Sequence, residues 1–261
     1  MGLLFSTLLF RWYVFFFWGV GLFALSRATG ALGALLRFAT AWGVAYLFEW
    51  SSARPGGWFP FGHYRYLPTT KDREIWLGIL PLMDSLSFSF LAVGALGVAG
   101  LLSGRSLKET LSAPGRLWWR LLPVATLLFT AIDMVIDPVA LRGSRWFLGQ
   151  IYDYPEGGAY FGVTLTNFIG WAVTGGTILG LWRILPLRWE RRGEASTLDR
   201  LLPPFLYLSV YFFNLSVAFW LREWRIAGAD ILLALFIVGL LVWVRRFLMP
   251  RQQGVHGGQT S

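Results

Sequence analysis

Seven long apolar stretches, joined by shorter polar connections, limit most strongly what this chain can fold into. They lie at approximately 3–25, 30–51, 76–102, 119–141, 160–186, 203–222 and 226–248, and a helix needs only about 20 residues to cross a bilayer. Hydrophobic residues make up 56% of the sequence, which is too much for an ordinary soluble domain. The sequence therefore predicts an all-α fold, a polytopic membrane helical bundle with about seven transmembrane helices.

We expect one integral-membrane helical domain over residues 1–250 and a disordered C-terminal tail over 251–261. The first apolar stretch contains Arg11 and lacks a small-residue cleavage site, so it is predicted to be a retained span and not a signal peptide. The segment GALGVAG, at 94–100, predicts close packing between helices, because small residues let helix backbones approach each other.

Lysine and arginine in the connections predict the orientation in the membrane. Thirteen of these residues would lie on one side and eight on the other, with Arg11 and Arg37 inside spans. The richer side is normally cytoplasmic, so we expect a multi-pass protein of the cell membrane with its N-terminus outside and its C-terminus in the cytoplasm. The net charge of +9 then faces anionic lipid, and no nucleic-acid partner is expected.

Two carboxylates, Asp133 and Asp137, stand in the second half of the apolar stretch LLPVATLLFTAIDMVIDPVAL. An ionisable side chain near the membrane core costs roughly 2.5–3.5 kcal/mol on insertion scales and usually carries function. Because the two residues are four apart, they should lie on one helical face, close enough to share a proton or a water. The structural alternative is that one caps or ends the helix before Pro138, or pairs with an arginine.

Other polar residues are predicted to converge on the same membrane face. In the predicted topology the connections 51–75 and 142–159 open on that face, and several residues fall in the outer part of their spans, namely Arg11, Glu49, Asp84, Asp133, Asp137 and Asn167. The connections add His63, Tyr64, Tyr66, Asp153 and Glu156. One shared cavity would explain this convergence. For Glu49, Tyr64 and Tyr66 the alternative is an interfacial belt position, where polar and aromatic residues accumulate.

The residue types that are absent from this sequence exclude several kinds of chemistry. There is no cysteine, so a thiol nucleophile, a disulfide and a cysteine-bound iron–sulfur cluster are excluded. Only two histidines exist, His63 and His256, which is too few for a histidine-rich di-iron centre and makes a haem site improbable. The only lysines, Lys71 and Lys108, lie in predicted connections, so a retinal Schiff base inside a span is not expected. No glycine-rich strand-to-helix motif indicates a flavin or nicotinamide site.

The remaining functional groups are carboxylates, tyrosines, an asparagine and many aromatic rings. This set suits proton-driven chemistry on an apolar molecule without a cofactor or a metal. A carboxylic acid kept neutral by desolvation can protonate an alkene, and aromatic faces can stabilise the resulting tertiary cation by about 2 kcal/mol or more each in a dry site. Water then completes the addition.

Three ordered segments carry a family resemblance: GGWFPFGHYRY at 56–66, DMVIDPVALRGSRWF at 133–147, and GGAYFGVTLTNFIGW at 157–171. Together they resemble the membrane carotenoid biosynthesis family that includes bacterial carotenoid 1′,2′-hydratases and the archaeal bisanhydrobacterioruberin hydratase. The resemblance covers most of the chain up to about Trp182. Members of that family add water to the terminal double bond of an acyclic ψ-end of a carotenoid, without a redox cofactor. The resemblance implies the same activity here.

The resemblance assigns importance to the positions of this sequence that match the family's motifs. They are Phe61, Gly62, Tyr64, Tyr66, Asp133, Asp137, Pro138, Tyr160, Phe161, Gly162, Asn167, Gly170 and Trp171. The predicted function is thus a carotenoid hydratase acting on the C1′–C2′ double bond of a ψ-ended carotenoid of the γ-carotene or lycopene type, giving a tertiary alcohol. Its substrate would lie within the bilayer, and other carotenoid pathway enzymes are candidate partners.

The predicted catalytic residues are Asp133, Asp137, Glu49 and Asp84. In this hypothesis one of Asp133 and Asp137 protonates C2′, and Glu49 or Asp84 deprotonates the attacking water. The predicted substrate-binding residues are His63, Tyr64, Tyr66, Tyr160, Phe161, Asn167 and Trp171. Among them, Asn167 and Tyr64 would hydrogen-bond the water, whereas Trp171 and Phe161 would line the cation pocket.

Two other function classes stay open at this point. A membrane prenyltransferase is suggested by Asp133 and Asp137 as an Asp-x-x-x-Asp pair that would hold Mg²⁺ against a diphosphate. That reaction needs a second acidic cluster, and the sequence offers only the isolated Asp199 and Asp230. A non-enzymatic protein that binds carotenoid or lipid is the other alternative, and there the buried carboxylates would stabilise helix packing.

Overall fold

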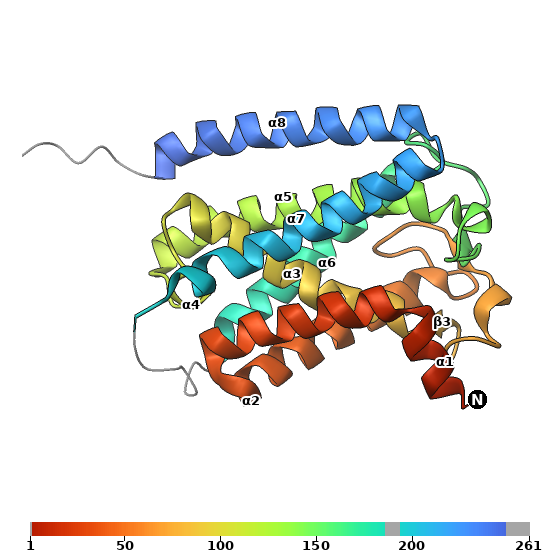
Figure 1. Ribbon diagram of the computed structural model, residues 1–261, viewed down its shortest axis with the longest axis horizontal. Coiled ribbons are helices and arrows are strands. Elements are labelled where there is room, and N and C mark those ends of the chain that lie inside the picture. Colours follow the sequence, from red (N-terminus) through yellow and green to blue (C-terminus); the bar gives the residue numbers. More distant parts are fainter. Residues whose placement is uncertain (1, 186–193, 249–261) are drawn as a thin grey trace, which may run out of the picture.

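A computed structural model describes residues 2–185 and 194–248, and the predicted tail at 251–261 lies outside these residues. The chain is a bundle of long helices, which confirms the predicted all-α membrane fold (Figure 1). The helices are α1 (Leu3–Phe10), α2 (Trp12–Ala53), α3 (Leu82–Leu102), α4 (Leu107–Leu111), α5 (Gly115–Ala140), α6 (Leu165–Ile184), α7 (Thr197–Trp220) and α8 (Trp224–Leu248). The strands are β1 (Arg65–Tyr66), β2 (Trp76–Leu77), β3 (Leu80–Pro81) and β4 (Tyr152–Asp153).

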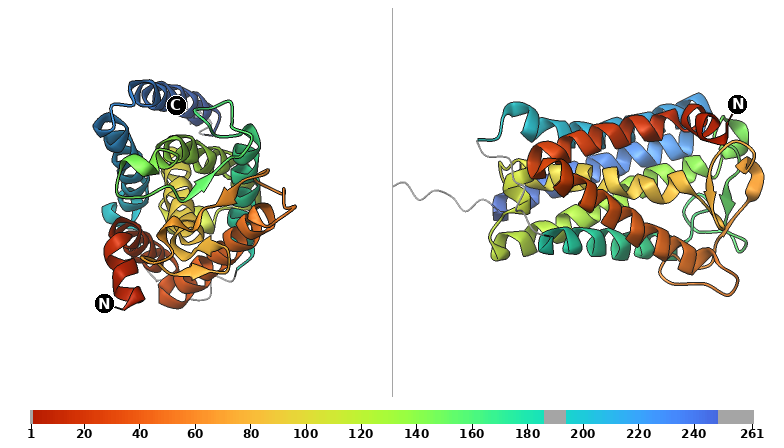
Figure 2. Two further views of the ribbon diagram at one scale, coloured as in Figure 1. Left: turned by 90° about the vertical axis from the view of Figure 1, so that its right-hand side faces the viewer. Right: turned by 90° about the horizontal axis from the view of Figure 1, so that it is seen from below.

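Helix α2 is a helical hairpin whose two arms meet at Gly30. This residue has φ 74° and ψ 164°, a conformation that a residue with a side chain rarely adopts. Figure 2 shows the chain reversing its direction at this point. The second arm corresponds to the second predicted stretch, but the first predicted stretch is divided at Arg11 between α1 and the first arm, so Arg11 does not lie inside one continuous span. Gly30 takes the place of a connecting loop between the two arms.

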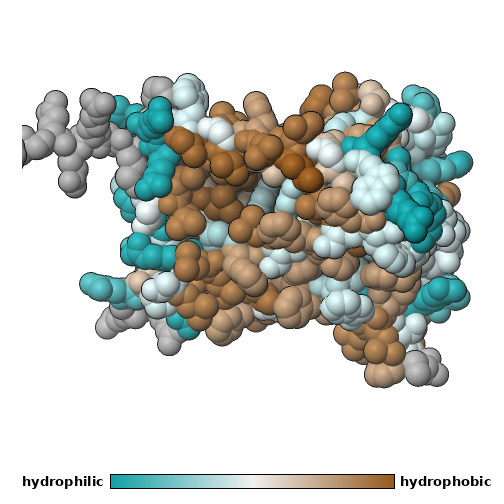
Figure 3. Space-filling model, turned by 45° about the horizontal axis from the view of Figure 1, so that its top comes forward, coloured by the Kyte–Doolittle hydropathy of each residue, from teal (hydrophilic) through white to brown (hydrophobic). Residues whose placement is uncertain are grey.

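Five of the described helices are long and apolar enough to cross a membrane: α2, α3, α5, α7 and α8. The remaining predicted stretch, at 160–186, forms the 20-residue helix α6. On the face shown in Figure 3, apolar residues cover the middle of the molecule and hydrophilic residues gather toward both ends. This distribution is the one expected of a protein whose sides face lipid.

Helix α3 lies at the centre of the bundle, where it contacts α2, α5, α6 and α7. The predicted close packing along GALGVAG is confirmed. A Cβ atom at Gly97 would lie 2.2 Å from Cβ of Pro203 on α7, and one at Gly94 would lie 3.1 Å from Cβ of Tyr207. The small residues of α3 thus allow α7 to approach the centre of the bundle.

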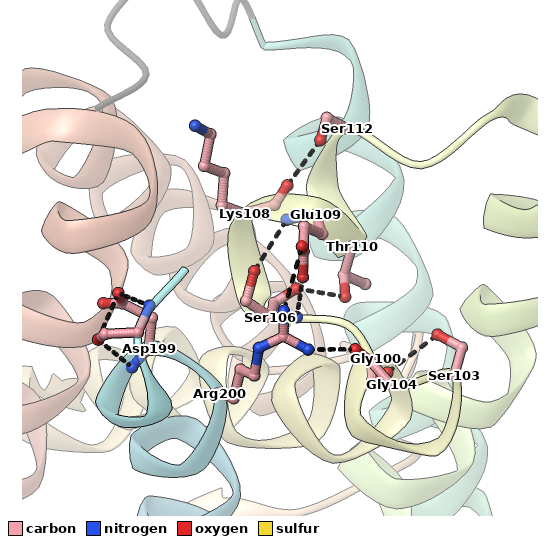
Figure 4. Close-up of polar contacts among 11 residues, drawn as sticks. Gly100, Ser103, Gly104, Ser106, Lys108, Glu109, Thr110, Ser112, Asp199 and Arg200 are labelled. Atoms are coloured by element: carbon pink, nitrogen blue, oxygen red, sulfur yellow. Dashed lines mark hydrogen bonds and ion pairs between the residues drawn. The ribbon is translucent and has the colours of Figure 1, made fainter. Parts of the chain in front are cut away.

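One end of the bundle is held by hydrogen bonds between α4, the end of α3 and the start of α7 (Figure 4). The Ser106 side chain and Glu109 form a capping box at the start of α4. Arg200 donates to the carbonyl of Gly104 at 2.7 Å and also contacts Glu109 at 3.5 Å. Lys108 and Arg200 belong to the basic side in the predicted topology, whose orientation in the membrane stays a prediction.

The opposite end carries the two long connections, and short strands join them directly. Strand β1 pairs antiparallel with β4, so that Arg65 lies opposite Asp153 and Tyr66 lies opposite Tyr152. Seen along the bundle, these strands lie across the ends of the helices (Figure 2). A buried ion pair fastens the first of these connections to the start of α2. Arg11 donates to both carboxylate oxygens of Glu74, at 2.7 and 2.6 Å, and their side chains are 1% and 0% exposed.

The substitution Glu74→Gln tests this ion pair. It removes the counter-charge of Arg11 while keeping the size of the side chain, and it leaves the guanidinium buried and uncompensated. Because breaking a buried pair is expensive, we expect the free energy of unfolding to fall by about 3–5 kcal/mol. Thermal unfolding of the purified protein in detergent measures the change.

The matched control is Asp153→Asn, which removes the partner of Arg65 in an ion pair at the surface. Solvent screens such pairs, so the melting temperature should change much less. Equal shifts in the two variants would contradict a structural role for the Arg11–Glu74 pair.

Candidate active site

A cavity lies inside the bundle beneath the paired connections. Its walls come from both arms of α2, from α3, α5, α6 and α7, and from the connections around residues 61–66 and 146–154. The volume that the centres of water molecules can occupy in this cavity is about 140 Å³. The total volume free of protein atoms, which includes the open mouth of the cavity, is about 960 Å³. A single buried water needs only about 10–15 Å³ by the first measure. The cavity therefore has room for a small portion of an organic molecule together with water.

Asp133 and Asp137 lie on one face of α5, as their spacing predicted, and they share one hydrogen-bond donor. The amide nitrogen of Asn167, on α6, donates to an oxygen of Asp133 at 2.7 Å and to an oxygen of Asp137 at 2.9 Å. Asp137 lines the cavity, whereas Asp133 is fully buried behind it. Two carboxyl groups that share one donor cannot both carry a charge cheaply, so this pair is suited to holding one proton.

Asp137 also accepts hydrogen bonds from two tyrosine hydroxyls. Tyr152 donates at 2.7 Å and Tyr154 at 2.9 Å. Helix α5 continues through Pro138 to Ala140, so Asp137 does not end the helix. Within the described residues, neither aspartate forms an ion pair with an arginine. The structure thus differs from both structural alternatives for this pair.

A second group of carboxylates forms the opposite wall of the cavity. Glu49, near the end of α2, and Asp84, in the first turn of α3, both line the cavity. The Tyr66 hydroxyl donates to Glu49 at 3.1 Å. Among the described residues, one carboxylate oxygen of Glu49 and one of Asp84 are buried without a hydrogen-bond partner. A buried acceptor without a partner is costly, so both carboxyl groups call for a proton or a hydrogen-bond donor that the described residues do not supply.

Four tyrosines connect the two walls, and the strand pairing explains why they meet. Tyr64 and Tyr66 are two residues apart, as are Tyr152 and Tyr154, so in extended chain each pair points to one face. All four line the cavity. The residue between each pair, Arg65 or Asp153, points outward, and the two charges meet there at 2.8 Å.

The tyrosine hydroxyls stay protonated, because their surroundings disfavour the phenolate. Burial raises the pKa of Tyr152 and Tyr154 well above the usual value, and the neighbouring Asp137 carboxylate raises it further. Burial likewise raises the pKa of Tyr64 and Tyr66, with Glu49 as the next largest cause. At neutral pH Tyr66, Tyr152 and Tyr154 therefore donate hydrogen bonds to carboxylates, whereas Tyr64 donates to the backbone carbonyl of Glu49 at 3.4 Å.

Aromatic rings form the inner end of the cavity. Trp171 on α6 stacks on Phe88 of α3, with ring centroids 4.2 Å apart and planes inclined by 15°. Phe61 packs edge-on against Phe88 at 6.2 Å. A Cβ atom at Gly170 would lie 2.4 Å from Cδ1 of Phe61, so this glycine is required for the ring to reach its position. All three rings line the cavity, which presents their apolar faces close to Asp137 and Asn167.

Comparison with known protein families shows to which family this chain belongs. The family of carotenoid biosynthesis proteins matches residues 3–239, from the first residue of α1 to the middle of α8. The chain belongs to the carotenoid biosynthesis protein family. This result confirms the resemblance seen in the three motifs and extends it beyond Trp182 into α7 and α8. No curated protein and no solved structure matches the chain.

Membership in the carotenoid biosynthesis protein family gives the cavity an expected occupant, an apolar carotenoid within the membrane. The structure brings eight of the predicted site residues together at this cavity. They are Asp133, Asp137, Glu49, Asp84, Tyr64, Tyr66, Asn167 and Trp171, although Asp133 touches it only through its neighbours. Sequence reasoning missed Tyr152 and Tyr154. Their alternation with the charged Asp153 was the available signal.

Three predicted binding residues lie away from the cavity in this carotenoid biosynthesis protein. His63 is exposed at the end of the bundle. The rings of Tyr160 and Phe161 contact each other at 4.9 Å, and the carbonyl of Phe161 accepts a hydrogen bond from Arg142 at 2.6 Å. Phe161 has φ 53°, an unusual backbone conformation outside glycine. Their role in substrate binding stays a prediction.

A magnesium site of the prenyltransferase kind would need further acidic ligands near Asp133 and Asp137. Within residues 2–185 and 194–248 there is no group of three or more His, Asp or Glu residues arranged to hold a metal. Asp199 forms an ion pair with Arg27 and belongs to a capping box at the start of α7. Asp230 is buried on α8. Glu49 and Asp84 bring two further carboxylates to the cavity, but among the described residues they form no such group with Asp137. The described residues therefore give the prenyltransferase alternative no metal site.

Replacing Asn167 by Ala tests the coupling between the two aspartates. The change leaves an oxygen of Asp133 without its donor, and an unsatisfied buried polar group costs about 1–3 kcal/mol. We expect that loss in the free energy of unfolding, measured on purified protein in detergent. In a double-mutant cycle with Asp133→Asn, the combined loss should be non-additive by about 0.5–3 kcal/mol, as is typical of contacting residues. Strict additivity would show that the shared hydrogen bond does not exist in solution.

Proposed function

We propose that this chain is a carotenoid hydratase that adds water across the terminal C1′–C2′ double bond of a ψ-ended carotenoid, giving a tertiary 1′-alcohol. The observation that carries the proposal is a membrane-embedded cavity with two carboxylate walls and an aromatic inner end. Hydration of an alkene is redox-neutral, so it requires an acid, a base and a water but no redox cofactor. Membership in the carotenoid biosynthesis protein family supports the choice of substrate.

The first step is transfer of a proton to C2′ of the terminal isoprene unit. In the proposed mechanism the proton comes from the Asp133–Asp137 pair, and it leaves through Asp137 because that carboxyl faces the cavity. The π electrons of the double bond form the new C–H bond, and C1′ becomes a tertiary cation. The faces of Trp171, Phe88 and Phe61 would stabilise this cation, since aromatic faces attract positive charge strongly in a dry site.

The second step is attack of water on C1′ from the opposite wall. In the proposal the carboxylates of Glu49 and Asp84, which line the cavity, orient this water and accept its proton. The new C–O bond forms from a lone pair of the water, and loss of one proton leaves the alcohol. The net reaction adds one water to the alkene and moves one proton from one wall to the other.

For the next turnover the proton must return from Glu49 or Asp84 to the aspartate pair. The tyrosines supply hydroxyl groups between these walls. Tyr66 donates to Glu49, whereas Tyr152 and Tyr154 donate to Asp137. The rings of Tyr66 and Tyr152 pack edge-on with centroids 6.0 Å apart, and in the proposal water between the two hydroxyls completes the path.

The direct test of the proposed activity uses membranes that contain the protein, a ψ-ended carotenoid and ¹⁸O-labelled water. A more polar pigment, heavier by one labelled water, is the expected product, and mass spectrometry detects it. Asp133→Asn and Asp137→Asn should abolish this product while folded protein remains in the membrane, because neither amide can supply the proton. Asp153→Asn, which changes only the surface ion pair, is the matched control.

Retained turnover in both Asp133→Asn and Asp137→Asn would exclude the aspartate pair as the acid. A carotenoid that binds to the wild type but is recovered unchanged would exclude the hydratase and favour a binding protein. Product carrying oxygen from O₂ in place of labelled water would indicate an oxygenase.

Changing a tyrosine to phenylalanine tests the return of the proton. We expect the pair Tyr152→Phe and Tyr154→Phe, made together, to lower steady-state turnover about 10²-fold or more, a typical contribution of positioned acid–base groups. A single turnover, measured with enzyme in excess over carotenoid, should change much less if the acid starts protonated. Equal losses in both measurements would instead assign the tyrosines to the chemical step itself.

A further inference from the structure

The proposed reaction does not use one part of the cavity lining, which lies between the first arm of α2 and α7. This part is largely apolar: Tyr13, Val14 and Phe17 from α2, and Val210, Phe213 and Asn214 from α7. Arg11 also lines the cavity, and it donates to the Tyr13 hydroxyl at 3.1 Å, so the polar end of Tyr13 is already paired. An apolar lining of this kind suits a hydrocarbon chain better than it suits water or a charged group.

Aromatic rings lie where this apolar region approaches the surface of the protein. Tyr13 and Phe213 stack with their ring centroids 5.2 Å apart and planes inclined by 16°. Trp146 contacts Phe147 at 5.0 Å, and Phe147 contacts Tyr13 at 5.6 Å. Tyr13, Trp146 and Phe213 line the cavity and are each partly exposed, whereas Phe147 is 44% exposed and lies outside the lining. These rings thus stand between the cavity and the outer surface.

The outer surface beside these rings is apolar. Three side chains on this surface are more than half exposed: Trp12 and Phe16 on α2, and Phe212 on α7. Each of these residues directly precedes a residue that lines the cavity. In a membrane this surface faces lipid acyl chains. A molecule that leaves the cavity past Tyr13 and Phe213 therefore enters hydrocarbon.

The length of the substrate requires such an exit. The cavity-lining residues of α3 run from Asp84 to Leu91, a rise of about 10 Å along the helix. A carotenoid is a stiff rod several times longer, so only one end of it can occupy the cavity. The rest must pass through a wall, and the walls that bear carboxylates and tyrosines would leave polar groups unpaired against a hydrocarbon chain.

We propose that the polyene of the carotenoid leaves the cavity between the first arm of α2 and α7, and that Tyr13, Trp146 and Phe213 select a long, flat chain there. This inference rests on the proposed hydratase function. Tyr13 and Phe213 stack on each other in this structure, so the polyene would separate the two rings and stack on their faces, with the offset geometry that π systems prefer. The far end of the carotenoid stays in the bilayer and is not recognised, so cyclic and acyclic far ends are both accepted.

The test compares Phe213→Trp, which narrows the exit, with Phe212→Trp, which places the same ring on the neighbouring residue facing away from the cavity. Each variant is given a full-length ψ-ended carotenoid and a short acyclic isoprenoid alkene with the same terminal group, small enough to fit wholly inside. Phe213→Trp should lower turnover of the carotenoid about tenfold or more while the short alkene loses no more than about twofold, since only the long chain meets the added ring. Phe212→Trp should leave both rates unchanged.

Equal losses on both substrates, or no loss on either, would overturn the exit and leave the hydratase intact. Absence of hydrated product from either substrate with the wild type would instead remove the proposed function.

A second measurement does not depend on turnover. A phenylalanine analogue that carries a photoreactive diazirine is placed at position 213 or, as the control, at position 212, and the membranes are irradiated with carotenoid present. Attachment of carotenoid to position 213 in preference to 212 is expected, even in Asp137→Asn protein that makes no product. Attachment at 212 alone, or equally at both positions, would overturn the exit between α2 and α7.

Discussion

Carboxyl groups buried at membrane depth need donors, and this requirement organises the candidate site. Asp137 has three of them, one from Asn167 on α6 and two from the tyrosines of the connection after α5. In a dry site each hydrogen bond to a charged group is strong, and each buried charged group that lacks a hydrogen bond is costly. The same contacts that make Asp137 tolerable therefore draw the 146–154 connection over the cavity, and its pairing with β1 brings Tyr64 and Tyr66 to the opposite wall. Closure of the cavity and placement of its acid are consequences of one set of bonds.

The two walls differ in the partners they give their carboxylates. Asp137 has three donors, whereas Glu49, Asp84 and also Asp133 each keep one oxygen without a partner among the described residues. Three donors favour the charged form of Asp137, so in the proposal the shared proton rests on Asp133 and reaches the substrate through Asp137. A base that must bind and orient a mobile water benefits from an open acceptor. The asymmetry in hydrogen bonding thus matches the proposed division of labour between the walls.

Much of the fold follows from apolar length and helical spacing, which are local properties. The helical stretches, the common face of Asp133 and Asp137, and close packing along the small residues of α3 were all predictable from neighbours in the sequence, although the partner α7 was not. The bond from Asn167 to both aspartates joins residues 34 and 30 positions apart, and the Arg11–Glu74 pair joins residues 63 apart. Neither leaves a local pattern. The inward tyrosines had a local signal in the alternation of Tyr64, Arg65 and Tyr66, but only the pairing of β1 with β4 shows that the second alternating segment faces the same cavity.

Because the two arms of α2 meet at Gly30, a small rotation at this residue moves the far end of the first arm by a large distance. Tyr13, at the exit from the cavity, lies about 25 Å along the first arm from this single glycine. A rotation of only about 5° at Gly30 would carry Tyr13 through about 2 Å, a displacement large enough to separate its ring from that of Phe213. The second arm ends beside the cavity with Glu49. Gly30 lies at the opposite end of the bundle from the carboxylates. The backbone conformation of Gly30 thus sets the spacing between the first arm, which borders the proposed exit, and the second arm, which holds Glu49.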